Sequence, residues 1–197
     1  MPLEIEIKYL DVDHETLRRR LRELGARFIS RGFESNTVYD DPARSLKATG
    51  TLLRLRERNN RFVLTLKRAS AQTSATAKIY EESETEVANA PALREILSGL
   101  GYAPALRYEK MREKWELDGC EVCLDTLPFG LFAEIEGAET GIAACALALG
   151  LPPEKASKAT YHDLNRLHRK SAGLPPDDTF VFADDDKAKV LARRGTD

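Results

Sequence analysis

Segments along most of this chain alternate polar and apolar residues, and nearly all of the polar positions carry a charge. Residues 4–8 read Glu-Ile-Glu-Ile-Lys, and residues 53–56 read Leu-Arg-Leu-Arg. Successive side chains of a β-strand point to opposite faces, so each segment predicts a strand with one apolar and one charged face. This criterion predicts about eight strands, at 4–8, 33–40, 53–56, 63–67, 77–87, 105–116, 120–127 and 131–138.

The charged positions that share a face fit two arrangements. One is an open sheet with one face packed and the other in water. The other is a barrel that closes around a polar interior, with helices covering its apolar outside. Periodicity cannot show whether a sheet closes, so both arrangements stay open at this point.

The chemistry of the charged face indicates a ligand. Arginine and lysine bind phosphate oxygens, and pairs of glutamates hold hard cations such as Mg²⁺ or Mn²⁺. Charges buried without a partner cost several kcal/mol each in lost hydration, so a closed charged interior is better explained by a bound ligand than by stability. A metal-bridged polyphosphate would satisfy both kinds of side chain.

The overall composition excludes some classes of protein. Lys and Arg number 30 against 32 Asp and Glu. A nucleic-acid binder with a broad basic surface would carry a net positive charge, so no nucleic-acid partner is expected. The N-terminus lacks a signal peptide pattern and no apolar run is long enough to span a membrane, so a cytoplasmic location is expected. The three cysteines, Cys120, Cys123 and Cys145, suit a reducing compartment and predict no metal site.

Helical periodicity interrupts the strands at 13–24, 91–98, 140–150 and 161–171. The expected helix starts are Asp13, Pro91, Thr140, and Thr160 with Asp163 as a capping box. Tight hairpin turns are expected at Asn59-Asn60 and Asp118-Gly119. The histidines His14, His162 and His168 fall on these helices without shared ligand spacing, so no chemistry is assigned to them.

The composition changes after Gly173, where prolines and aspartates precede a basic segment. This change predicts a main domain over residues 1–172 and a C-terminal appendage over 173–197, made of a linker and a short helix. Whether two copies form a homodimer stays open.

Seven short segments, in order, resemble the CYTH family of triphosphate tunnel metalloenzymes, which is named after class IV adenylyl cyclases and thiamine triphosphatases. The resemblance covers about residues 3 to 165. The segments are EIEIK at 4–8, VYDDP at 38–42, LRLR at 53–56, LTLK at 64–67, YEESE at 80–84, KMR at 110–112, and LD at 124–125 followed by FAEIE at 132–136.

This resemblance implies an α+β protein dominated by β-structure, an eight-stranded antiparallel closed barrel with flanking helices. It implies that the triphosphate is held by basic residues, namely Lys8, Arg54, Arg56, Lys67, Lys110 and Arg112. It also implies that Mg²⁺ or Mn²⁺ is bound at four catalytic carboxylates, namely Glu4, Glu6, Glu134 and Glu136. Glu82 and Glu84 are expected as further tunnel carboxylates.

The chain departs from the family pattern at Tyr80, where an arginine is common, and Lys78 on the same face is a candidate replacement. Members often add a basic residue from C-terminal helical structure, and the sequence does not decide between Lys155 and Lys158.

Three reactions fit a triphosphate in a metal-bearing tunnel. They are hydrolysis of inorganic or nucleoside triphosphate, hydrolysis of thiamine triphosphate, and cyclisation of ATP to cyclic AMP with release of pyrophosphate. We favour hydrolysis because it demands less specialised recognition than aiming a ribose hydroxyl at the α-phosphorus. A non-catalytic polyphosphate- or RNA-binding module is a further alternative, although phosphate binding alone needs no metal carboxylates.

Overall fold

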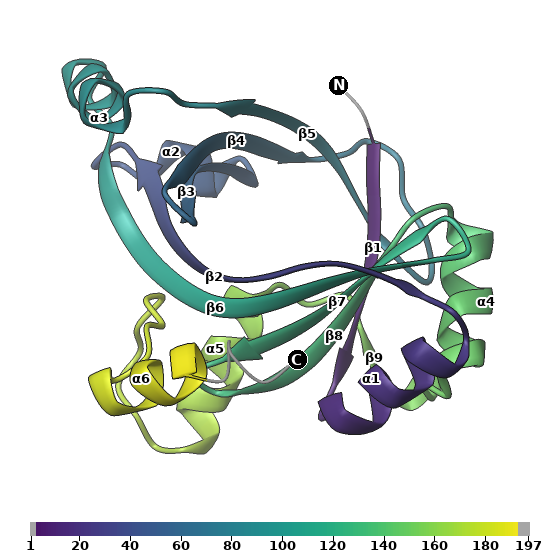
Figure 1. Ribbon diagram of the computed structural model, residues 1–197. Helices are drawn as coiled ribbons and strands as arrows, with labels where there is room; N and C mark the ends of the chain where they lie inside the picture. Colours follow the sequence, from purple (N-terminus) through teal and green to yellow (C-terminus); the bar gives the residue numbers. More distant parts are fainter. Residues whose placement is uncertain (1–2, 193–197) are drawn as a thin grey trace.

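A computed structural model describes residues 3–192 of the chain as a closed antiparallel barrel surrounded by helices (Figure 1). The sheet order is β5-β4-β3-β2-β6-β7-β8-β1-β9, and β5 also pairs with β1. The eight barrel strands are β1 Leu3–Leu10, β2 Arg27–Asp40, β3 Thr51–Arg58, β4 Arg61–Ala69, β5 Lys78–Glu86, β6 Ala103–Leu117, β7 Cys120–Leu127 and β8 Gly130–Glu136. The expected closed eight-stranded antiparallel barrel is therefore confirmed.

Strand β1 closes the barrel because different parts of it pair with different neighbours. Residues Leu3 to Glu6 pair with β5, and residues Glu6 to Leu10 pair with β8. The two-residue strand β9, Ala156–Ser157, continues beyond β5 by pairing with Lys8 and Tyr9. The charged residues of β1 therefore lie where β5 and β8 meet and the barrel closes.

Both expected hairpin turns are present. Asn59 and Asn60 have φ values of 51° and 60° between β3 and β4, and Asp118 and Gly119 have φ values of 50° and 78° between β6 and β7. Two successive residues with positive φ are characteristic of the tight turn whose twist matches that of the flanking strands. These turns fix the register of β3 against β4 and of β6 against β7.

Six helices lie within the described residues: α1 His14–Glu23, α2 Ser45–Ala48, α3 Ala90–Gly99, α4 Glu139–Leu149, α5 Tyr161–Ser171 and α6 Asp184–Ala192. The four expected helices are α1, α3, α4 and α5. Asp13 caps α1 as expected, and Thr160 and Asp163 form the expected capping box of α5. The short helix α2 was not predicted.

The expected N-cap of α4 at Thr140 is wrong. Ala138 occupies the cap position without a side-chain hydrogen bond, and the helix begins at Glu139. The Glu139 carboxylate lies in the first turn, where the positive end of the helix dipole favours it, and accepts a hydrogen bond from Thr76 Oγ1 at 2.6 Å. The helix therefore begins without a capping side chain, with an acidic residue in its first turn.

The apolar core lies between the outer face of the barrel and the helices. Leu17 and Leu21 of α1 and Cys145 and Leu149 of α4 belong to one buried cluster with residues of β1, β6, β7 and β8. Figure 1 shows α1 and α4 on the same side of the barrel and α3 at the far end. The three cysteines are buried and free, in agreement with a structural role. This packing leaves the charged faces of the strands pointing inward.

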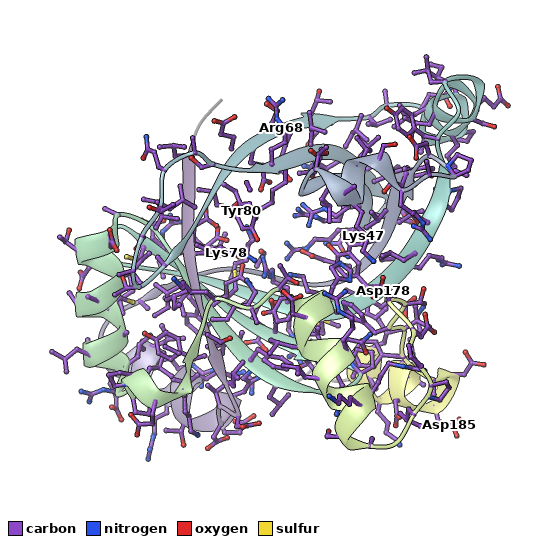
Figure 2. The ribbon with its side chains drawn as sticks, turned by 180° about the vertical axis from the view of Figure 1, so that it is seen from behind. Lys47, Arg68, Lys78, Tyr80, Asp178 and Asp185 are labelled. Atoms are coloured by element: carbon purple, nitrogen blue, oxygen red, sulfur yellow. The ribbon has the colours of Figure 1, made fainter. Side chains whose placement is uncertain are left out.

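The C-terminal segment packs on β6 where β7 does not reach. The amide of Phe180 donates to the Arg107 carbonyl at 3.1 Å, and the Glu109 amide donates to the Phe180 carbonyl at 3.0 Å. Two residues before Phe180, Asp178 accepts a hydrogen bond at its Oδ2 from Lys47 Nζ of α2 at 2.6 Å (Figure 2). The proposed division at residue 173 stays a prediction, and residues 193–197 of the expected appendage lie outside the described residues.

No helix within residues 3–192 is both long and apolar enough to cross a membrane.

Candidate active site

The inward face of the barrel surrounds a cavity of about 320 Å³. Ten of the twelve candidate site residues line it: Glu4, Glu6, Lys8, Arg54, Arg56, Lys67, Glu82, Lys110, Arg112 and Glu134. They come from β1, β3, β4, β5, β6 and β8, so alternation on separate strands brings them together. Glu84 and Glu136 are not among the described residues that line the cavity.

Lys8 lies between two buried carboxylates. Its Nζ donates to Glu6 Oε1 at 2.6 Å and lies 3.1 Å from Glu134 Oε2. Burial disfavours the charged form of Lys8, but the negative charges of Glu134 and Glu6 outweigh burial and raise its pKa above the usual lysine value. Lys8 is therefore a permanent positive charge on the cavity wall.

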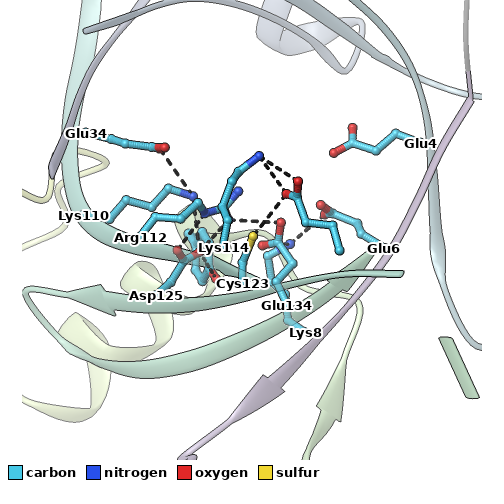
Figure 3. Close-up of polar contacts among 12 residues, drawn as sticks. Glu4, Glu6, Lys8, Glu34, Lys110, Arg112, Lys114, Cys123, Asp125 and Glu134 are labelled. Atoms are coloured by element: carbon cyan, nitrogen blue, oxygen red, sulfur yellow. Dashed lines mark hydrogen bonds and ion pairs between the residues drawn. The ribbon is translucent and has the colours of Figure 1, made fainter. Parts of the chain in front are cut away.

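Asp125 organises the basic residues of β6 and was missed as a site residue in the sequence, although it belongs to the LD segment. It is fully buried and accepts from Arg112 Nε at 2.7 Å, Lys110 Nζ at 3.2 Å and the Tyr161 hydroxyl at 2.7 Å. Figure 3 shows Lys110 and Arg112 converging on it. Burial raises the pKa of Asp125, but Arg112 and Lys110 prevail and hold it at about 2.

Glu84 acts on the cavity through the arginines of β3. Its Oε1 accepts from Arg56 Nη2 at 3.1 Å, Arg54 Nη2 at 3.3 Å and Thr65 Oγ1 at 2.7 Å. Burial opposes its ionisation, but the Thr65 hydrogen bond and the charge of Arg56 lower the pKa of Glu84 to about 2. Glu84 therefore holds both guanidinium groups in place and is a positioning residue.

Lys67 lies among three carboxylates and one aromatic ring. It forms a close ion pair with Glu4, and its Nζ lies 3.3 Å from Glu82 Oε2. The same Nζ lies 4.2 Å from the centre of the Tyr80 ring. Tyr80 thus lines the cavity as a support for Lys67, which is a different role from that of the arginine common in the family.

Lys78, the candidate replacement for that arginine, lies beside the Tyr80 ring. Its Nζ lies 5.2 Å from the centre of the Tyr80 ring, and Lys78 is not among the described residues that line the cavity (Figure 2).

The two C-terminal lysines that were candidates lie away from the cavity. Lys155 Nζ donates to the Asp11 carbonyl at 2.6 Å, and Lys158 Nζ donates to the Ser74 carbonyl at 3.2 Å. The C-terminal contribution to the cavity wall comes instead from α5 and the segment after it, through Tyr161, His162, Arg166 and Asp178. His162 lies on a helix, as expected, and is also among the described residues that line the cavity.

The carboxylates offer oxygen ligands for a divalent cation, although residues 3–192 contain no preformed cluster of three or more His, Cys, Asp or Glu side chains able to hold a metal ion. Glu6 lies opposite Glu136 across β1 and β8. Burial and the charges of Glu4 and Glu121 raise the pKa of Glu136 to about 7. Burial and a hydrogen bond with Glu4 raise the pKa of Glu82 to about 8. A hard cation would relieve this crowding of carboxylates, so the donor set fits Mg²⁺ or Mn²⁺.

The fold and the cavity together define a barrel that encloses basic residues and carboxylates in one tunnel. The CYTH domain model matches residues 2–146, and the chain belongs to the CYTH family. A protein of Methanocaldococcus jannaschii named "Putative adenylate cyclase MJ0240" is 27% identical over 135 residues, which cover 68% of this chain and 76% of that protein.

Solved structures share the fold at lower sequence identity. A "putative adenylate cyclase" from Vibrio parahaemolyticus has a TM-score of 0.71 at 21% identity, covering 83% of this chain and 97% of that one. The "putative adenylyl cyclase HpAC1" from Hippeastrum, whose structure is described as revealing a dominant triphosphatase activity, has a TM-score of 0.59 at 17% identity, covering 90% of this chain and 99% of that one. At these identities the similarity supports the barrel fold.

Proposed function

We propose that this protein hydrolyses a triphosphate, inorganic or nucleoside, in a reaction that depends on a divalent cation. The observation that carries the proposal is the gathering of six basic side chains from four strands in one cavity of about 320 Å³. A single phosphate would occupy only some of them. A chain of linked phosphates can contact all four strands at once, and each contact is a charge-assisted hydrogen bond. The basic residues are Lys8, Arg54, Arg56, Lys67, Lys110 and Arg112.

The residues that would hold the cation are Glu4, Glu6, Glu134 and Glu136. When bound, Mg²⁺ or Mn²⁺ would neutralise phosphate oxygens and lower the pKa of a coordinated water. The side chains of the protein bind and orient the phosphates. Arg54 and Arg56 present guanidinium forks to phosphate oxygens, and the buried Lys8 and Lys110 add fixed positive charges. Ion pairs with Glu84 keep Arg54 and Arg56 oriented before the ligand arrives, and an ion pair with Asp125 does the same for Lys110.

Cyclisation of ATP to cyclic AMP and pyrophosphate is the second candidate, favoured by the name of the 27% identical relative from Methanocaldococcus jannaschii. Both reactions would use the same basic residues and the same cation, but they differ in the nucleophile. Hydrolysis uses water at the terminal phosphorus, and cyclisation uses the ribose 3′-hydroxyl at the α-phosphorus. A binding module without turnover is disfavoured by the carboxylates, which phosphate binding alone does not need.

Product analysis tests the proposal. The purified protein is incubated with Mg²⁺ or Mn²⁺ and either ATP, inorganic triphosphate or thiamine triphosphate. Orthophosphate together with a diphosphate product is expected. Cyclic AMP with pyrophosphate would indicate cyclisation in place of hydrolysis. Metal-dependent binding without any product would support the binding module.

Arg56→Ala is expected to weaken binding of a triphosphate much more than binding of a monophosphate. Arg54 and Arg56 are two residues apart on β3, about 7 Å along the strand, which suits neighbouring phosphates of one ligand. Arg56→Lys should recover only part of the affinity because the bidentate fork is lost. Calorimetry with a non-hydrolysable triphosphate and metal measures this effect. Equal losses for both ligands would mean that the tunnel recognises isolated phosphates.

A further inference from the structure

Four polar residues within residues 3–192 have an exposed fraction of 0%, namely Glu34, Asn36, Thr65 and Asp125. Two of them are hydrogen-bonded by the barrel itself. Thr65 Oγ1 donates to Glu84 Oε1 at 2.7 Å. Asp125 Oδ1 accepts from Arg112 Nε at 2.7 Å. By contrast, both carboxylate oxygens of Glu34 and both amide atoms of Asn36 lack a hydrogen-bond partner in the described part of the chain. Buried polar groups of this kind are stabilised when a ligand supplies the missing hydrogen bonds.

Glu34 and Asn36 lie at the inner end of the cavity. Arg44 and Gly50, which flank α2 beyond the C-terminal end of β2, are exposed and line the cavity at its open end. The inward-facing positions of β2 run from Val38, which lines the cavity, through Asn36 to Glu34, because side chains alternate along a strand. We use the name cavity floor for Glu34 and Asn36.

The cavity floor borders two of the proposed phosphate-binding residues. Asn36 is paired with Arg56 of β3, and Glu34 is paired with Lys110 of β6. Glu34 Oε2 lies 3.8 Å from Lys110 Nζ, as Figure 3 shows. That separation exceeds a direct hydrogen bond, and a water molecule can bridge two such groups. Burial disfavours the charged form of Glu34, but Lys110 and Arg56 outweigh burial and lower its pKa, so its carboxylate is a hydrogen-bond acceptor.

Arg58 lies behind the cavity floor. Its Nη1 is 3.6 Å from Glu34 Oε1, and its Nη2 donates to Ser30 Oγ at 2.9 Å. Gly32, the next inward position of β2, leaves room for this side chain, because a Cβ at residue 32 would lie 2.5 Å from Arg58 Nε. Arg58 therefore covers Glu34 from the far end of the barrel, and a ligand reaches the cavity floor from the open end.

The position of the cavity floor fixes the side from which a terminal phosphate can be attacked. A triphosphate that enters from the open end places a terminal phosphate innermost, and any group esterified to its other end stays toward the opening. In phosphoryl transfer the attacking and leaving oxygens lie roughly in line on opposite sides of the phosphorus. The leaving oxygen is the bridging oxygen, which points toward the opening. A water that attacks the terminal phosphorus therefore comes from the side of Glu34 and Asn36.

We infer that the cavity floor holds the water molecule that attacks the terminal phosphorus, with Glu34 as its proton acceptor and Asn36 as a second hydrogen-bond partner. The inference rests on the proposed function, because it needs hydrolysis of a triphosphate. The water oxygen forms a bond to the terminal phosphorus as the bond to the bridging oxygen breaks, and the electron pair of the broken bond stays on the diphosphate. One proton of the water passes to Glu34 and leaves with orthophosphate or solvent water.

Binding of the phosphate prepares Glu34 to accept this proton. Without a ligand, the charges of Lys110 and Arg56 stabilise the Glu34 carboxylate. Phosphate oxygens that contact these two cations offset part of their charge, so the carboxylate takes up a proton more readily in the complex.

The cavity floor would serve hydrolysis and not cyclisation. Cyclisation takes place at the α-phosphorus, which lies two phosphates nearer the opening than the terminal phosphorus. Glu34 and Asn36 would then be too deep in the barrel to hold the nucleophile, which must lie in line with the leaving oxygen.

Steady-state kinetics and calorimetry in the presence of Mg²⁺ test the inference. The substrate is inorganic triphosphate or ATP, whichever the wild type hydrolyses, and the binding probe is a non-hydrolysable triphosphate. Glu34→Gln is expected to lower kcat about a hundredfold or more, the usual contribution of a proton acceptor. Its affinity for the probe should equal or exceed that of the wild type, because a negative charge beside the phosphates is removed. A residue that only positions Lys110 would lower that affinity when replaced.

Asn36→Val is expected to lower kcat about tenfold through the loss of a hydrogen bond to the water. Its melting temperature should equal or exceed that of the wild type, because the variant removes two buried polar atoms that have no partner within residues 3–192. Glu109→Gln is the matched control and should keep the wild-type kcat. Glu109 is a buried glutamate, 4% exposed, that accepts from Lys187 and does not line the cavity.

A kcat of Glu34→Gln close to that of the wild type would overturn the inference and leave the proposed function standing. A loss of probe affinity in this variant would overturn it as well, because Glu34 would then only position Lys110. Formation of cyclic AMP by the wild type, or no turnover at all, would refute the proposed function and the inference with it. Circular dichroism checks folding. If Glu34→Gln does not fold, Asn36→Val carries the test, and a wild-type kcat in that variant would overturn the inference.

Discussion

Replacing Glu6 or Glu136 with glutamine is expected to lower metal-dependent turnover of a triphosphate by about two to three orders of magnitude while leaving the barrel folded. Glutamine keeps the size of the side chain but removes the negative charge that would hold a divalent cation. The two residues lie opposite one another on β1 and β8, so both would serve the same cation. Lys8 would keep Glu134 as a partner at 3.1 Å in the Glu6 variant.

Steady-state kinetics at several Mg²⁺ and Mn²⁺ concentrations measure the effect, with circular dichroism as the check on folding. Glu57→Gln is the matched control, because Glu57 is an exposed glutamate on β3 whose parity is opposite to that of the arginines. This control should retain wild-type turnover. Near-normal metal-dependent turnover in both the Glu6 and the Glu136 variant would refute the assignment of the metal ligands.

Alternation of residue types predicted the face on which most of the site residues lie. Arg54 and Arg56, for example, alternate with Leu53 and Leu55, and the structure places both arginines on the cavity wall. The local rule works because the side-chain period of a strand does not depend on its neighbours. It could not predict closure, since the pairing of Leu3 with Glu81 joins distant parts of the chain. Closure was expected from the family resemblance, and the structure confirms it.

Alternation along a strand also could not distinguish the residues that line the cavity from the residues that position them. Glu82 and Glu84 share a face of β5, yet only Glu82 is among the described residues that line the cavity. Glu84 is opposite Thr65 and turns toward the arginines of β3. Such differences arise from contacts across two strands and are absent from the pattern of any one strand. The assignment of Glu84 and Glu136 to the site stays a prediction.

The part of the cavity wall formed by α5 and the segment after it could not be predicted from the sequence pattern. Phe180 and Asp178 belong to a segment without alternation, and their positions depend on hydrogen bonds with the backbone of β6 and on ion pairs. His162 was assigned no chemistry because it shares no ligand spacing with the other histidines. A capping box correctly predicted the start of α5, but a helix start does not show which side chain faces a cavity.

Asp125→Asn is expected to destabilise the protein by about 3–5 kcal/mol, the usual effect of removing one partner from a buried ion pair. For a chain of this size that corresponds to a fall of roughly 10 °C in melting temperature. The carboxylate is fully buried and contacts Arg112 and Lys110. Without its charge, Arg112 would keep Glu134 at 3.1 Å, and Lys110 would keep Glu34 at 3.8 Å. Two buried cations would then be only partly compensated.

The same variant separates a structural ion pair from one that also prepares a ligand site. If Lys110 and Arg112 face the phosphates, a bound triphosphate supplies the missing negative charge, and a ligand that binds the folded state raises its stability. Thermal melting with and without inorganic triphosphate should therefore show a larger rise for Asp125→Asn than for the wild type. Asp185→Asn on the exposed first turn of α6 is the control and should melt close to the wild type. A melting temperature for Asp125→Asn that is equally low with and without triphosphate would mean that Lys110 and Arg112 serve the fold and do not contact the ligand.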